Sequence, residues 1–268
     1  MKIKKGDFVA RISYGKDILF VIDRIIKLKN GTTYAILKGV TVRIEADAPI
    51  EDIEKVELNR VINAERMAEK LLMQRIKNKA EEYRNYSVKT GKILHLDGDR
   101  RYSEKSARYY KKMGLDAVVK NIPENKQPLM VRKLLEKYNP DILVITGHDA
   151  MLKKGMNYSN IYNYRNSANF INTVRESRKW ARSSNKLVIF AGACQSFFEA
   201  LIEAGADFAS SPGRILIDFI DPLIVVERVA ITDRNKFVSS YEIAREIKEG
   251  EKGISGVGAM GKKKVIIM

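Results

Sequence analysis

The chain has 268 residues, a single cysteine and a formal net charge of +16. This length can bury a substantial core, and one cysteine excludes an internal disulfide. No apolar run reaches the ~20 residues of a membrane span, and the charged N-terminus lacks the apolar segment of a signal peptide. We therefore expect a cytoplasmic protein of a reducing compartment, without a membrane span.

The positive charge is compatible with a nucleic-acid partner, because Lys and Arg neutralise phosphates without reading a sequence. The basic residues are spread along the chain, however, and many lie on helix faces that we expect to be solvated. Acidic protein surfaces explain the charge equally well. Nucleic acid is therefore not expected as a partner, and the oligomeric state stays open.

Residues 1–58 have an all-β pattern. Short apolar or alternating runs predict strands, and Asn30-Gly31 is a hairpin turn signal between two of them. The predicted strands cover residues 7–12, 17–22, 33–37 and 40–44. Several short strands in so few residues indicate a small SH3-like or Tudor-like β-barrel domain.

Residues 59–88 predict an amphipathic connecting helix. They contain no proline or glycine, and apolar residues recur at helical spacing among Lys, Arg and Glu. The apolar positions are Ala64, Met67, Leu71, Leu72 and Ile76. We expect this stripe to pack on one of the two flanking domains.

Residues 89–268 alternate between strand and helix patterns. Predicted strands cover 92–97, 116–119, 141–146, 187–191, 206–209 and 223–229, with a final edge strand at 265–267. Predicted helices cover 103–113, 128–138, 167–182, 196–204 and 241–248. Repeated strand–helix units with apolar strands predict an α/β domain: a mostly parallel sheet with helices on both faces.

Two of these strands end in chemically active side chains. Cys194 follows an apolar strand and the small residues Gly192-Ala193, and His148 follows another strand and Gly147. Active sites of open α/β sheets lie at the carboxyl ends of strands. We expect a nucleophile and general-base dyad there, with the start of the next helix favouring the thiolate and the glycines leaving room for a peptide.

The dyad resembles that of the caspase-like clan of cysteine proteases, in which the histidine lies roughly 50 residues before the cysteine. Gly192 replaces the glutamine of the caspase cysteine box, and Asp149 replaces the glycine that usually follows the histidine. These departures argue against a true caspase. By analogy, the backbone N–H groups of Asp149 and Cys194 would stabilise the oxyanion.

A closer resemblance, to the YabG family of sporulation-specific proteases, covers nearly the whole chain. The motifs that carry it are Gly6–Arg11 (GDFVAR), Leu94–Asp99 (LHLDGD), Asp141–Ala150 (DILVITGHDA), Phe190–Ser196 (FAGACQS) and Ala209–Pro212 (ASSP). The resemblance implies a Cys194/His148 dyad and cleavage of spore-coat and germination proteins, typically after arginine. It also implies a place in the mother cell, at the forming spore coat.

An enzyme that cleaves after arginine needs a carboxylate in its S1 pocket, which holds the side chain before the cut bond. Asp97 and Asp99 end the first strand of the α/β domain, at the expected edge of the sheet. We predict Asp97 or Asp99 for this role, with Asp149 as a third candidate. Helix capping or cation binding is the alternative for Asp97 and Asp99.

For several other residues a purely structural role is expected or fits equally well. His95 alternates with leucines inside a strand and reads as a satisfied core histidine, while Ser210 and Ser211 fit either the pocket or a turn. No His/Cys spacing suits zinc and no phosphate-binding glycine motif is present, so we expect neither a metal nor a cofactor.

A different class of function remains open. The chain could be a basic binding or scaffold protein for nucleic acid or coat protein, in which Cys194 is buried and inert. In a further version that keeps the protease, the N-terminal barrel would recruit protein substrates.

Overall fold

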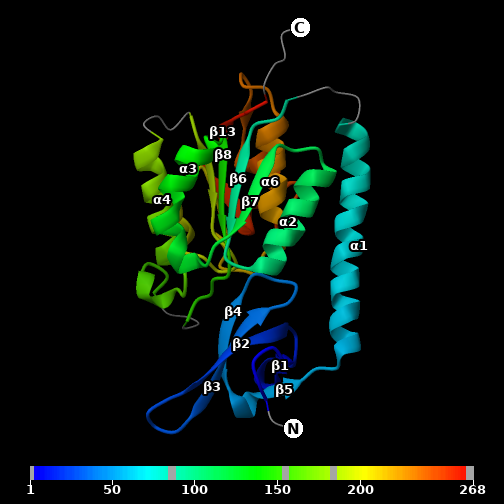
Figure 1. The fold of residues 1–268 in the computed structure, drawn as a ribbon, viewed down its shortest axis with the longest axis vertical. Coiled ribbons are helices and arrows are strands. Elements are labelled where there is room, and N and C mark those ends of the chain that lie inside the picture. The colour runs from blue at the N-terminus through cyan, green and yellow to red at the C-terminus, as the bar shows by residue number, and fades with distance from the viewer. Residues whose placement is uncertain (1–2, 84–88, 153–156, 182–185, 264–268) are drawn as a thin grey trace.

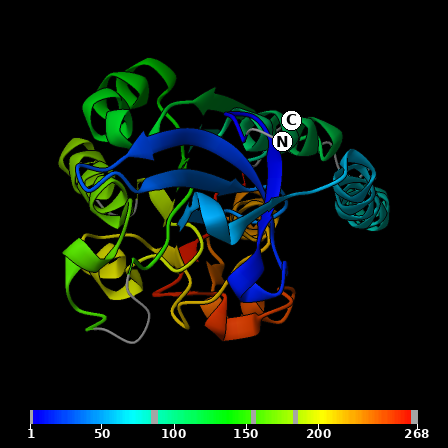
Figure 2. The ribbon, with the colours of Figure 1, turned by 90° about the horizontal axis from the view of Figure 1, so that it is seen from below.

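A computed structural model describes residues 3–83, 89–152, 157–181 and 186–263. For residues 78–83 it describes the backbone alone. Two sheets and a long helix organise these residues (Figure 1). The N-terminal sheet lies against the carboxyl ends of the parallel strands of the larger sheet (Figures 1 and 2). The division into domains at 58 and 88 stays a prediction.

The N-terminal sheet has five antiparallel strands in the order β4-β3-β2-β1-β5. They are β1 (Phe8–Arg11), β2 (Leu19–Lys27), β3 (Thr33–Gly39), β4 (Glu45–Pro49) and β5 (Ile53–Lys55), with short 3-10 helices η1 (Ile12–Tyr14) and η2 (Ile50–Asp52). The hairpin predicted at Asn30-Gly31 joins β2 to β3, and Gly31 has a φ of 87° there. The strand order does not by itself establish a closed SH3-like barrel.

The prediction of a strand at residues 40–44 is wrong. These residues form a bend, and regular strand pairing resumes only at Glu45. Val42 and Ile44 instead make isolated bridges to Asp218 and Asp149 of the larger domain. Tertiary pairing therefore overrides the local β-pattern.

The connecting helix is α1 (Leu58–Tyr83), and residues 84–88 lie outside the described part. Leu72 and Ile76 are buried against α2, whereas Met67 and Leu71 are 69% and 59% exposed. Only part of the predicted stripe is therefore buried, and α1 lies along the outside of the larger domain (Figure 1).

The larger sheet has the order β12-β10-β9-β8-β6-β7, and β12 alone runs antiparallel to its neighbour. Its strands are β6 (Ile93–Asp97), β7 (Ala117–Asn121), β8 (Ile142–Thr146), β9 (Val188–Ala191), β10 (Phe208–Ser210) and β12 (Ile254–Gly256). The prediction of a mostly parallel sheet is confirmed. Continuous apolar runs suit these strands because both faces of the sheet are covered.

Helices cover both faces of this sheet, as predicted (Figure 1). One face packs on α2 (Arg100–Lys112) and α6 (Asp221–Ile231), and the other packs on α3 (Gln127–Tyr138), α4 (Ser167–Trp180) and α5 (Phe198–Glu203). The 3-10 helices η3 (Glu124–Lys126), η4 (Ile161–Asn163) and η5 (Gly250–Lys252) lie in the connections.

The strand predicted at 223–229 is wrong, because this segment is the interior of α6. A short continuous apolar run fits a buried helix as well as a buried strand. Pro222 lies in the first turn, where its missing N–H costs nothing, and nearly the whole helix is buried.

The C-terminal part adds β11 (Phe237–Val238), α7 (Ser240–Ala244) and β13 (Ala259–Met260). The helix predicted at 241–248 is therefore shorter than expected. The edge strand predicted at 265–267 lies outside the described residues. Within the described part of the chain, no helix is long and apolar enough to cross a membrane.

Candidate active site

The carboxyl ends of β6, β8 and β9 bring the predicted site residues to one edge of the larger sheet. The strands are parallel neighbours, with Asp97 opposite Thr146 and Ile145 opposite Ala191. The turns that carry His148 and Cys194 leave β8 and β9 at this edge. The strand adjacency on which the predicted dyad depends is thus present.

The turn that carries Cys194 has an unusual backbone. Gly192 has a φ of 113°, and a Cβ there would lie 2.4 Å from the Ser210 hydroxyl oxygen. Gln195 has a φ of 55°, a backbone conformation that residues other than glycine rarely adopt. The glycine therefore serves the turn itself, and the interpretation that it leaves room for a peptide is wrong.

Hydroxyl groups hold this turn. Ser196 accepts a hydrogen bond from Ala193 N–H at 2.9 Å, and Ser210 donates to the Ala193 carbonyl at 2.9 Å. The Ser211 hydroxyl accepts from Gln195 N–H at 3.0 Å. Ser210 and Ser211 thus fix the position of the cysteine turn.

Cys194 is fully buried, and Ile217 N–H points at its sulfur from 3.4 Å. Burial raises the pKa of the thiol to about 12, although the nearby backbone of Ile217 and Arg43 lowers it. The expectation that the turn favours the thiolate is wrong for this arrangement, because desolvation outweighs the backbone dipoles.

His148 is also fully buried. Its Nε2 lies 3.9 Å from Asp99 Oδ2 and its Nδ1 lies 4.0 Å from Glu124 Oε1, and neither nitrogen has a hydrogen-bond partner among the described residues. Burial lowers the pKa of the imidazole to about 4, whereas the Asp99 carboxylate raises it. The neutral ring is therefore favoured, with two carboxylates beside it.

Glu124 is a site residue that the sequence patterns missed. Its carboxylate accepts a hydrogen bond from His148 N–H at 2.8 Å, and burial raises its pKa. A Cβ at Gly98 or Gly147 would lie 2.1 or 2.5 Å from Glu124 Oε1. Gly147 therefore makes room for Glu124 and not, as expected, for a peptide. Paired glycines after two neighbouring strands were the available signal.

Asp97 is fully buried and forms an ion pair with Arg43 of the N-terminal sheet. It also accepts hydrogen bonds from the Thr146 hydroxyl at 2.9 Å and from Asp99 N–H at 2.8 Å. Burial raises the pKa of Asp97, but Arg43 and His95 hold it well below its usual range. A buried carboxylate that binds a guanidinium is what an arginine pocket requires, and the S1 role itself stays a prediction.

The other two carboxylates have partners of their own. Asp99 caps α2 by accepting from Arg101 N–H at 2.7 Å and Tyr102 N–H at 3.3 Å, which is the capping alternative. Asp149 accepts from the hydroxyls of Ser167 at 2.5 Å and Ser196 at 2.9 Å. Burial raises the pKa of Asp149 to about 6.

His95 and the metal question are simpler. The ring of His95 is buried, with Nδ1 3.0 Å from the Tyr110 hydroxyl and Nε2 2.7 Å from the Thr146 hydroxyl. This matches the interpretation as a satisfied core histidine. Among the described residues, no group of three or more His, Cys, Asp and Glu could hold a metal ion.

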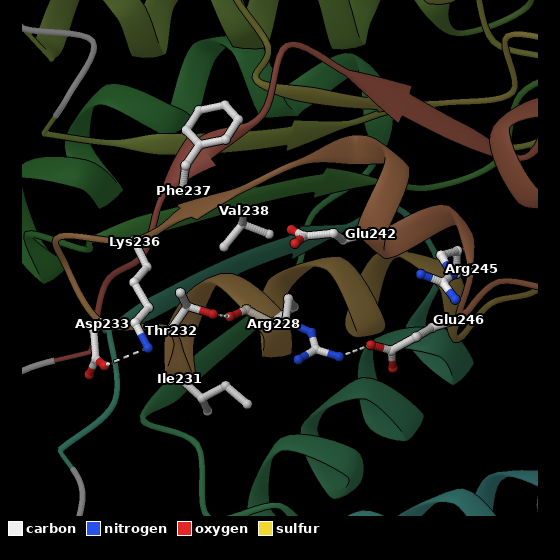
Figure 3. Close-up of a pocket in the computed structure, with 10 residues that line it drawn as sticks. All are labelled: Arg228, Ile231, Thr232, Asp233, Lys236, Phe237, Val238, Glu242, Arg245 and Glu246. Atoms are coloured by element: carbon white, nitrogen blue, oxygen red, sulfur yellow. Dashed lines mark hydrogen bonds and ion pairs between the residues drawn. The ribbon is translucent and has the colours of Figure 1, made fainter.

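A separate cavity of about 570 Å³ lies at the C-terminal end of α6 (Figure 3). The helix begins at its other end with Asp221, and Asp218, which precedes it, pairs with Val42 beside the candidate site. Lys236 pairs with Asp233 at the cavity, and Arg228 pairs with Glu246. It contains none of the predicted site residues.

Sequence comparison assigns the chain that forms this site to a known family. The model of the YabG peptidase U57 family matches residues 4–267. The chain belongs to the YabG peptidase family. A YabG relative, the sporulation-specific protease YabG of Bacillus subtilis (strain 168), is 38% identical over 279 residues, which cover 97% of this chain and 96% of the relative. No solved structure matches. The YabG match includes both sheets and every predicted site residue.

Proposed function

We propose that this YabG-family peptidase is a cysteine endopeptidase that cleaves after arginine, with Cys194 as nucleophile and His148 as general acid and base. One observation carries the proposal. The sheet edge that holds both turns also holds a buried carboxylate, Asp97, already paired with a guanidinium.

The proposed reaction follows from these positions. The Cys194 sulfur attacks the carbonyl carbon after the P1 arginine, and the negative oxygen is bound by the N–H groups of Asp149 and Cys194. His148 takes the thiol proton and gives it to the leaving amine. Water then hydrolyses the thioester, and the arginine carboxylate leaves.

Asp97 is the preferred S1 residue because it is the candidate that already binds a guanidinium, whereas the other two bind N–H and hydroxyl groups. The Asp99 side chain caps α2, and the Asp149 side chain accepts from two serine hydroxyls. The acidic partners of His148 would then be Asp99 and Glu124, which we propose as positioning residues for the imidazole.

The finer expectations rest on the family resemblance. We propose spore-coat and germination proteins as substrates, in the mother cell at the forming coat, and a caspase-like arrangement of the sheet. The relative from Bacillus subtilis is described as a sporulation-specific protease, which agrees with this setting. We further propose that the N-terminal sheet, which lies beside the candidate active site (Figure 1), recruits these protein substrates.

The test is cleavage of a fluorogenic arginyl peptide by the purified chain and by Cys194→Ala and His148→Ala. Both variants should lose activity by several orders of magnitude while keeping the circular dichroism spectrum of the parent. Undiminished cleavage by Cys194→Ala would contradict the proposal.

The scaffold alternative keeps one supporting observation, the complete burial of Cys194 with its raised pKa. A peptidyl-arginine chloromethyl ketone separates the two functions. A cysteine endopeptidase is alkylated at Cys194 and inactivated. An inert thiol is not, and mass spectrometry of the Cys194 peptide would report no added mass.

A further inference from the structure

The bend between β3 and β4 enters the candidate active site from the N-terminal sheet. Arg43, in this bend, is fully buried, and Val40, Ile44 and Glu45 on either side of it are buried as well. Its guanidinium pairs with Asp97, and its carbon Cζ lies 4.6 Å from the centre of the Tyr102 ring. The side chain thus fills the position that we assign to a P1 arginine.

The backbone of this segment is also placed as a bound peptide would be. Asp149 N–H donates to the Arg43 carbonyl at 3.3 Å, and Glu45 N–H donates to the Asp149 carbonyl at 3.2 Å. Val42 pairs antiparallel with Asp218. Extended peptides bind proteins through such main-chain bonds on both sides.

The position of the Arg43 carbonyl has a specific meaning. Its hydrogen-bond donor, Asp149 N–H, is one of the two groups that we assign to the oxyanion. The backbone of Arg43 also lies near enough to the Cys194 thiol to lower the pKa of that group. The bond that would face the nucleophile is therefore Arg43–Ile44.

A purely structural ion pair explains these contacts less well. Nε and Nη2 of Arg43 are buried and have no hydrogen-bond partner among the described residues. Buried charges that serve stability satisfy their remaining donors, since each unpaired one costs free energy. A pocket that evolved to bind the arginine of a substrate need not supply a hydrogen-bond acceptor for every N–H group of Arg43.

We propose that residues 42–45 are an internal, substrate-like inhibitor in which Arg43 occupies the S1 pocket until the segment is displaced. The proposal rests on the proposed function, because it uses the same Asp97 pocket and the same nucleophile. An external substrate must compete with a tethered one, which lowers the apparent activity to the fraction of molecules in which the site is open. It also accounts for the burial of Cys194 and His148.

The first test compares Arg43→Gln with the parent in cleavage of an arginyl peptide. Arg24→Gln is the matched control, since Arg24 lies in the same sheet but is exposed and pairs with its neighbour Asp23. Arg43→Gln should raise kcat/KM about tenfold or more, mostly through a lower KM. Arg24→Gln should leave it unchanged. Equal activity of the parent and a folded Arg43→Gln would overturn the inhibitor proposal but not the protease proposal.

The second test uses the unmodified chain and so does not depend on a variant that folds. A peptidyl-arginine aldehyde is added, and hydrogen exchange of the Glu45 amide, which donates to Asp149, is followed. Displacement of the segment predicts faster exchange of this amide. Unchanged or slower exchange in the aldehyde complex overturns the proposal. If no arginyl peptide is cleaved by any form, the protease proposal fails as well.

Discussion

The guanidinium of Arg43 and the carboxylate of Asp97 form an ion pair in which neither side chain is exposed to solvent. The arginine lies in the bend between β3 and β4 of the N-terminal sheet, and the aspartate ends β6. This single pair therefore joins the two sheets at the edge where the His148 and Cys194 turns lie. Removing either partner alone leaves an uncompensated buried charge.

Asp97→Asn should reduce cleavage of arginyl peptides by about a hundredfold, because the substrate guanidinium loses its counter-charge. It should also lower the free energy of unfolding by about 3–5 kcal/mol, since Arg43 is left unpaired. Urea denaturation and steady-state kinetics measure the two effects.

The double variant Arg43→Met, Asp97→Met separates these effects. It removes both charges and should recover most of the stability without recovering arginine cleavage. Efficient arginine cleavage by either variant would exclude Asp97 as the S1 carboxylate.

Asp99→Ser should lower kcat and move the acid limb of the pH–rate profile to lower pH. The Asp99 carboxylate raises the pKa of His148, so removing its charge lowers that pKa further. Serine is chosen because it keeps the N-cap of α2. Asp99→Ala, which loses the cap too, should cost about 1 kcal/mol more stability in thermal unfolding. An unmoved acid limb in Asp99→Ser would show that Asp99 does not act on His148.

His148→Gln should change how stability depends on pH. Burial holds the folded pKa of His148 at about 4, below its ordinary value of 6.5, so the unfolded chain takes up the proton first as the pH falls. The stability that the neutral ring contributes is complete above 6.5 and is lost as the pH falls towards 4.

Relative to His148→Gln, the parent should therefore lose roughly 3 kcal/mol between pH 7 and pH 4. Urea unfolding at several pH values measures this difference, and His95 is present in both proteins. A difference that does not vary with pH would mean that the imidazole is solvated.

Gly192→Ala should destabilise the fold and impair the cysteine turn, because the new Cβ meets the Ser210 hydroxyl at 2.4 Å in addition to the backbone cost at a φ of 113°. Gly31→Ala is the matched control. Gly31 has a φ of 87° but nothing within 4 Å of an added Cβ, so that variant carries the backbone cost alone, about 1 kcal/mol. Thermal unfolding of both variants, with peptide cleavage by each, tests this. Equal losses would show that the turn relaxes around the methyl group.

Much of the larger domain could be predicted because its strands are buried on both faces. Strand β8 and the run that ends in Cys194 are continuously apolar and stop at small residues, so their type, direction and carboxyl ends followed from local pattern. Parallel pairing of neighbours then brought His148 and Cys194 to one edge.

The same apolarity misled at 223–229, since a fully buried helix has no polar face to reveal its period. Glu124 was missed for another reason. None of the predicted site residues is close to Glu124 in the chain, and its partner His148 follows a different strand.

The chain sequence by itself determined the strand–helix alternation, the candidate dyad and the cluster of aspartates, because each depends on neighbours close in the chain. Only the tertiary structure decided which aspartate meets a guanidinium, how deeply Cys194 is buried, and that residues 40–44 form a bend that pairs with the larger sheet's turns. These outcomes depend on desolvation and on pairing between segments distant in sequence: Arg43 forms an ion pair with Asp97, and Ile44 forms a β-bridge with Asp149.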